Sequence, residues 1–233
     1  MTGAERARFP WGLTVVVAAA LAMLIALGVW QVRRLAWKEG LIAAAAAAAA
    51  RPVAPLQIVL AEGGDGEFRR VAIDCPGLAA APYVELRTLH DGEAGVRLVS
   101  ACAAGGATWL VDRGFVAESV SARPPVTPDA TPTRVEAVIR RAPPPGPMTP
   151  PPTGRVFYGR DTAAMARALG VSGPVDPRTL YAVVSSNPDW PALRPIAPPV
   201  AFSNNHLGYA LTWFGLAAAL VAVYASLLWR RRA

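Results

Sequence analysis

The chain has 233 residues, 53% of them hydrophobic, and a formal net charge of +7. This basicity does not indicate nucleic-acid binding, because most of it flanks two long apolar segments, whereas residues 51–205 carry 15 basic and 14 acidic side chains. Arginine and lysine beside apolar segments are typical of anchoring at the headgroups of a membrane. We therefore expect the lipid bilayer among the partners of this chain, and no nucleic acid.

The two apolar segments, residues 11–30 and 206–229, contain no Asp, Glu, Lys or Arg. Each has about 20 residues, which as a helix spans a hydrocarbon core about 30 Å thick, so both predict transmembrane helices. A cleaved signal peptide is the alternative for the first segment. That segment is longer than the apolar region of such peptides and lacks a small-x-small cleavage site after it, which favours a retained anchor.

Residues 31–50 predict a helical extension of the first span. Nothing at residues 31–39 breaks a helix, and the alanine run at 43–50 strongly favours one. Pro52 and Pro55 are expected to end it.

The charges beside the spans leave the orientation open. Residues 1–10 and 230–233 are expected to be short cytoplasmic tails, because their arginines favour the cytoplasmic side. Arg33, Arg34 and Lys38 lie just past the first span, on the opposite side, and nearly balance them. Since long loops cross a membrane largely regardless of charge, an exported central domain is favoured.

Residues 51–205 predict a mainly antiparallel β domain with proline-rich loops. Apolar and polar residues alternate with a period of two in short runs between Gly- or Pro-rich breaks, as is typical of half-buried strands. The expected strands lie at residues 68–75, 83–90, 96–102, 108–116, 133–141 and 179–185. Because consecutive strands usually pair, we expect a half-open sheet or a small barrel.

Residues 161–170 predict one short helix, which Asp161 caps and Gly170 ends. The expected fold class is therefore a membrane protein of the α+β class. Two transmembrane helices flank a mainly antiparallel β exported domain with one short helix.

Cys75 and Cys102 fall on the apolar faces of two expected strands. In an oxidising compartment a disulfide between them closes a loop of about 26 residues and stabilises the domain by roughly 3 kcal/mol. Two buried free thiols are the alternative. Neither a Cys-x-x-Cys motif nor a Met-His cluster accompanies them, so a copper site is not expected.

Arg113 and Gly114 interrupt an otherwise apolar strand, and we expect a structural role for both. Arg113 is expected to pair with a carboxylate such as Asp112 or Asp161. Gly114 is expected to form a bulge or to allow another backbone to approach closely.

The chain offers little material for catalysis. It has two histidines, His90 in a turn sequence and His206 at the start of the second apolar segment, which argues against a Ser-His-Asp triad or a zinc site. A phosphate-binding glycine motif is also missing. We therefore expect a protein that is not an enzyme.

Three motifs resemble signatures of the surfeit locus protein 1 family. Residues 27–38 resemble its Gly-x-Trp-Gln-x-x-Arg-x-x-Trp-Lys signature, and residues 205–214 its Asn-x-His-x-x-Tyr-Ala-x-Thr-Trp-Phe motif. Residues 110–116 look like its Val-x-Arg-Gly-Trp-Val stretch, with Phe115 replacing the usual Trp. Residues 158–166 are similar to a weaker family element. The resemblance follows the family's order over nearly the whole chain.

The resemblance implies a membrane-bound assembly factor for haem-copper cytochrome c oxidase. It further implies a haem a chaperone that acts when this cofactor is inserted into oxidase subunit I, with subunit I and the haem a synthesis machinery as partners. The expected location is the bacterial inner membrane, with the central domain in the periplasm. A two-span sensing or scaffold protein without haem binding is the alternative. It is disfavoured because the residues before the first span and after the second are too few to form a cytoplasmic output domain.

With the resemblance, His206 becomes the expected axial ligand of the haem iron. On a helix, Tyr209 and Trp213 share its face at offsets of three and seven. Trp30 is a candidate to flank the porphyrin. Anchoring of these aromatic rings at the membrane interface is the alternative.

Arg33 and Arg34 lie at the same membrane face as His206. Guanidinium groups pair well with carboxylates, so both are candidates to hold the haem propionates. Anchoring to lipid phosphates is the alternative.

Overall fold

The computed structural model describes residues 9–196 and 204–231. The chain divides into two compact units. We call residues 1–43 with 201–233 the helix unit and residues 44–200 the sheet unit. Of the short tails expected at both chain ends, all but residues 9–10 and 230–231 lie outside the described residues.

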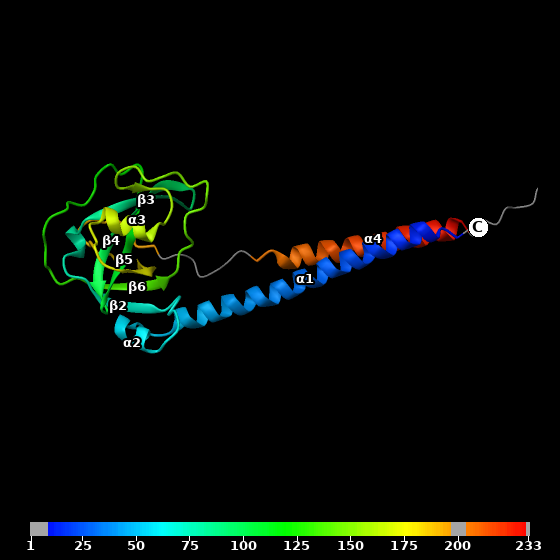
Figure 1. Ribbon diagram of the computed structural model, residues 1–233, viewed down its shortest axis with the longest axis horizontal. Helices are drawn as coiled ribbons and strands as arrows, with labels where there is room; N and C mark the ends of the chain where they lie inside the picture. The colour runs from blue at the N-terminus through cyan, green and yellow to red at the C-terminus, as the bar shows by residue number, and fades with distance from the viewer. Residues whose placement is uncertain (1–8, 197–203, 232–233) are drawn as a thin grey trace, which may run out of the picture. The chain divides into compact units, whose positions relative to one another are not determined.

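The helix unit pairs two antiparallel helices, α1 (Trp11–Ala50, to Ala43 within this unit) and α4 (His206–Arg230). Figure 1 shows them side by side, α1 in blue and α4 in orange to red. Hydrogen bonds join the hydroxyls of Thr14 and Tyr224 near one end of the pair, and Gln31 to His206 at the other. α1 is continuous from Trp11 to Ala50, which confirms the helical extension predicted for residues 31–50.

Both helices are long and apolar enough to cross a membrane. In the most apolar 18-residue stretch of each helix, only 6% is buried within the protein, whereas a core helix of a soluble domain is mostly buried. Their apolar side chains therefore face outward along lengths that fit the hydrocarbon core of a bilayer.

A glycine sets the closest approach of the two helices. A Cβ built on Gly28 would lie 2.6 Å from the ring of Phe214, so only glycine lets this ring rest on the backbone of α1. On α4, Ala210 and Ala217 are buried and lie seven residues apart, on one face. Small residues at the contact allow two helix backbones to come close, as in membrane helix pairs.

The sheet unit contains, among the described residues, one eight-stranded sheet in the order β1-β2-β6-β8-β5-β4-β3-β7. Figure 1 labels β2, β3, β4, β5 and β6 of this sheet. The strands are β1 (Ala54–Pro55), β2 (Arg70–Asp74), β3 (Tyr83–His90), β4 (Glu93–Ala104), β5 (Ala107–Ala117), β6 (Arg134–Arg140), β7 (Val156–Phe157) and β8 (Val175–Ala182). The short helices are α2 (Leu56–Ala61), η1 (Leu78–Ala80) and α3 (Thr162–Ala168).

The sheet is mixed, so the prediction of a mainly antiparallel sheet was wrong. The pairs β1·β2, β3·β7 and β5·β8 are parallel, and the other four pairs are antiparallel. Consecutive pairing holds for β3, β4 and β5, but β8 inserts between β5 and β6 and runs parallel to β5. A parallel neighbour needs a long crossover, and the chain between β5 and β8 supplies one.

The prediction of a single short helix was also wrong. α3 is present as predicted, and Asp161 accepts a hydrogen bond from the backbone N–H of Ala164 at 2.9 Å. α2 and η1 were missed. Pro55 occupies the N-cap position of α2, which buries Leu56 and Val59.

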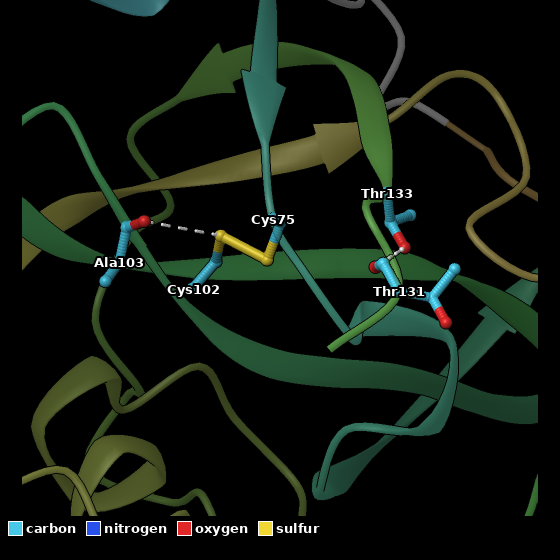
Figure 2. Close-up of a disulfide and its surroundings, with 5 residues drawn as sticks. All are labelled: Cys75, Cys102, Ala103, Thr131 and Thr133. Atoms are coloured by element: carbon cyan, nitrogen blue, oxygen red, sulfur yellow. Dashed lines mark hydrogen bonds between the residues drawn. A yellow bond between two sulfur atoms is a disulfide. The ribbon is translucent and has the colours of Figure 1, made fainter. Parts of the chain in front are cut away.

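A disulfide between Cys75 and Cys102 closes the curved sheet on itself (Figure 2). Cys75 follows β2 and Cys102 lies in β4, and three strands separate these two in the sheet. In a flat sheet they would be about 19 Å apart, yet their Cα atoms lie 5.8 Å apart. The sheet must therefore curl around its main apolar cluster, which contains both cysteines and the buried Trp109.

Replacing Gly28 by leucine is expected to lower the free energy of unfolding by about 1–3 kcal/mol, because the new side chain overlaps the Phe214 ring. Denaturant titration of the full chain in detergent micelles measures the change. Gly12→Leu is the matched control on the same helix, since a Cβ there meets nothing within 4 Å. Adding Phe214→Ala to Gly28→Leu is expected to recover part of the loss. If the separate effects of Gly28→Leu and Phe214→Ala on the free energy of unfolding simply add in the double variant, the contact is contradicted.

The disulfide predicts that a maleimide reagent labels neither cysteine of the denatured chain without reductant and both after reduction. The double variant Cys75→Ser, Cys102→Ser is expected to lose about 3 kcal/mol of stability, since the cross-link constrains the unfolded chain. Labelling of both thiols before reduction would refute the bond.

Candidate functional site

The helix-end site is formed by His206 at the start of α4 and by Trp30 and Gln31 on α1. α4 begins at His206, directly after Asn205 in the N-cap position. Gln31 lies three residues after Gly28, on the side of α1 that faces α4. The pairing of the two helices therefore brings together residues that are 175 positions apart in the chain.

A hydrogen bond of 2.7 Å joins Nδ1 of His206 to Oε1 of Gln31. The amide oxygen only accepts, so Nδ1 donates in this contact when it carries the ring proton. Gln31 is only 9% exposed, whereas His206 is half-buried. Nε2 of His206 makes no hydrogen bond to any residue that the structure describes, which leaves its lone pair available to a ligand.

Trp30 meets the His206 ring edge-on, with centroids 6.4 Å apart and planes at 83°. Tyr209 and Trp213 follow His206 along the same face of α4, as the spacing predicts. Trp30 and Tyr209 are more than half exposed, and Trp213 is half-buried. The site thus presents one imidazole beside accessible aromatic surface.

The two arginines of the site differ in their contacts. The guanidinium carbon of Arg34 lies 3.9 Å from the ring centroid of Trp37, a cation–π contact within α1. Arg33 is exposed and forms no ion pair with a described residue. The structure does not bring either arginine into contact with His206.

Sequence reasoning missed Gln31 as the partner of His206. A signal was present, because Gln31 belongs to the motif at residues 27–38 and is a polar residue directly after an apolar span. Its partner could not be named, since spacing along one helix says nothing about the facing helix.

A buried polar cluster, the Asp112 network, lies in the sheet unit. Oδ2 of Asp112 accepts from Nε of Arg97 at 2.7 Å and from Nη2 of Arg160 at 2.6 Å, while Oδ1 accepts from the Gly114 N–H at 3.2 Å. Both guanidinium groups also lie over the ring of Tyr181, at 5.5 and 4.9 Å. The fully buried carboxylate therefore links β4 and β5 to the segment before α3.

Burial raises the pKa of the Tyr181 hydroxyl, which keeps the ring neutral beside these charges.

Arg113 does not pair with a carboxylate among the described residues, so that prediction was wrong. Its Nε donates to Oγ of Ser186 at 3.0 Å and its Nη2 to the carbonyl of Ala79 at 2.8 Å. Neighbouring strand residues point to opposite faces, which keeps Arg113 from Asp112, and Asp161 caps α3. Burial lowers the pKa of Arg113 to about 10, so its charge persists at neutral pH.

Gly114 belongs to a bulge that lets the chain cross β5 closely. Leu98 pairs with Gly114 and Val99 with Asp112, so the residue between them is the extra one. Gly114 has φ of +139°, and a Cβ there would lie 2.4 Å from the carbonyl oxygen of Arg194. Next to it, Phe115 and Arg194 exchange two backbone hydrogen bonds of 2.7 and 2.8 Å.

A sequence model of the SURF1 family matches residues 18–218, most of the chain. The chain belongs to the SURF1 family. The matched region includes Gln31, Arg113, Gly114 and His206, and hence both the helix-end site and the bulge of β5.

Curated relatives of this SURF1 family member include surfeit locus protein 1 of Gallus gallus, 28% identical over 251 residues, which cover 98% of this chain and 76% of the relative. The Homo sapiens protein of that name is 28% identical over 219 residues, covering 83% and 70%. The SURF1-like protein of Drosophila melanogaster is 33% identical over 132 residues, covering 53% and 39%.

Asp112→Asn is expected to destabilise the sheet unit of this SURF1 protein by about 3–5 kcal/mol, because two buried guanidinium groups lose their shared anion. Chemical unfolding of the full chain, followed by circular dichroism, measures the change. The control Glu118→Gln removes an exposed pair with Arg87 and is expected to leave the unfolding midpoint unchanged. Equal midpoints for wild type and Asp112→Asn would contradict the network's role.

Proposed function

We propose that this chain is a non-enzymatic assembly factor for haem-copper cytochrome c oxidase, which holds haem a for insertion into subunit I. Members of the SURF1 family are known as cytochrome oxidase assembly factors, and the family match spans both the sheet unit and the helix pair. The observation that carries the haem part of the proposal is Nε2 of His206 at the end of the helix pair, which makes no hydrogen bond to any residue that the structure describes.

In this proposal α1 and α4 cross the inner membrane and the sheet unit lies in the periplasm. The outward apolar surface of both helices supports the first part, since water would otherwise cover it. The Cys75–Cys102 disulfide supports the second, because such bonds persist in oxidising compartments. The helix-end site then lies at the membrane boundary, with the oxidase and the haem a synthesis machinery as partners.

The residues of the helix-end site fit a haem. Imidazole is a common axial ligand of haem iron, and Trp30 and Tyr209 offer exposed aromatic surface for a flat apolar macrocycle. Arg33 is exposed and is the arginine proposed to attract a propionate, since Arg34 already contacts Trp37. When bound, haem a would supply the redox-active iron that the oxidase needs. The chain itself would bind, orient and shield it.

The test compares wild type, His206→Ala and His90→Ala in a strain that makes haem a and lacks the chromosomal gene. Wild type and His90→Ala are expected to purify with haem a and to restore fully haem-loaded oxidase. His206→Ala is expected to lose most of its haem and to restore less. Absorption spectra of the purified protein and the haem-to-oxidase ratio measure both effects.

Three outcomes would contradict parts of the proposal. If His206→Ala purifies with as much haem as the wild type, His206 is not the iron ligand. Full haem a in the oxidase of the deletion strain removes the assembly role. A requirement for the protein with no haem bound to it favours the alternative scaffold function.

A further inference from the structure

We propose that Gln31 is the positioning residue of the helix-end site. Its amide oxygen holds the imidazole proton of His206 on Nδ1 and thereby presents Nε2 as the electron-pair donor. Only the acceptor of that electron pair, a haem iron, rests on the proposed function. The orientation and tautomer of the ring follow from the helix pair itself.

The burial of Gln31 makes this contact specific. Its side chain is enclosed between α1 and α4, where water competes poorly for the amide oxygen. At 2.7 Å the Nδ1···Oε1 distance is that of a well-formed hydrogen bond. A buried amide oxygen without a donor is costly, so the pairing favours the Nδ1–H form of the ring.

Two further contacts limit the freedom of the ring. The Gly28–Phe214 approach, one turn away along α1, fixes the separation of the helices at this level. The Trp30 ring meets the imidazole edge-on and closes one side of it. Gln31 and Trp30 therefore both contact the His206 ring, while Nε2 makes no hydrogen bond to any residue that the structure describes.

The chemical consequence concerns the nitrogen opposite the hydrogen bond. An Nδ1–H that donates to a fixed acceptor sets the tautomer and increases the basicity of Nε2. Loss of such an outer partner typically weakens metal binding by about 10- to 100-fold. The same loss is expected here when Gln31 is replaced by an apolar residue of similar size.

The direct test is the ring tautomer in the full chain without haem. Protein labelled with 15N-histidine is studied in detergent micelles at about pH 8, above the ordinary histidine pKa of about 6.5. Long-range 1H–15N spectra are expected to give the Nδ1–H form for His206 in wild type and in Gln31→Glu, and to lose it in Gln31→Leu. His90 is the internal control and is expected not to change.

The matched control variant is Gln57→Leu, which changes the other glutamine of the chain, an exposed residue of α2. Titration with ferric protoporphyrin IX then measures affinity. Gln31→Leu is expected to bind it about 10- to 100-fold more weakly than wild type. Gln31→Glu, which restores an acceptor oxygen, and Gln57→Leu are expected to bind like wild type.

The outcomes separate this inference from the proposed function. An Nε2–H form of His206 in the wild type overturns the inference. So does unchanged porphyrin affinity in Gln31→Leu when His206→Ala has lost it. Unchanged affinity in His206→Ala overturns the ligand role instead, and the tautomer spectra still decide whether Gln31 controls the ring.

Discussion

The helix pair depends on a few polar and small residues that face each other along otherwise apolar surfaces. Apolar side chains alone set neither the register nor the rotation of two such helices, because they slide past one another at little cost. Here Thr14 with Tyr224 and Gln31 with His206 fix the register at both ends. Gly28 fixes the distance between the two helices. The helix-end site is a consequence of this pairing.

The sheet unit is held by constraints of a different kind. The disulfide joins β4 to the residue after β2, and the Asp112 network joins β4 and β5 to the segment before α3. Both lie inside the curled sheet unit, away from water. Arg113 adds a buried charge whose Nε and Nη2 donate to a hydroxyl and a carbonyl, while Nη1 has no hydrogen-bond partner among the described residues. These contacts specify how the strands close around the core, and such a scaffold offers a rigid surface for docking a partner under the proposed function.

Local patterns in the sequence were enough to predict where most helices and strands lie along the chain. They were not enough to predict how these elements are arranged in space. Alternation placed β3 at residues 83–90, and Asp161 marked the start of α3, because both signals depend on neighbouring residues. The position of β8 beside β5 depends on a long crossover that no local pattern records. For the same reason His206 was found as a candidate but Gln31 was not, since they are 175 positions apart.

The central claim is that Nε2 of His206 is an iron ligand in the haem-loaded protein. Electron–nuclear double resonance on oxidised protein carrying 15N-histidine tests it most directly. The account predicts a strongly coupled 15N nucleus that disappears in His206→Ala and persists in His90→Ala. A haem-loaded protein without such a nucleus, or one that keeps it in His206→Ala, would contradict the account.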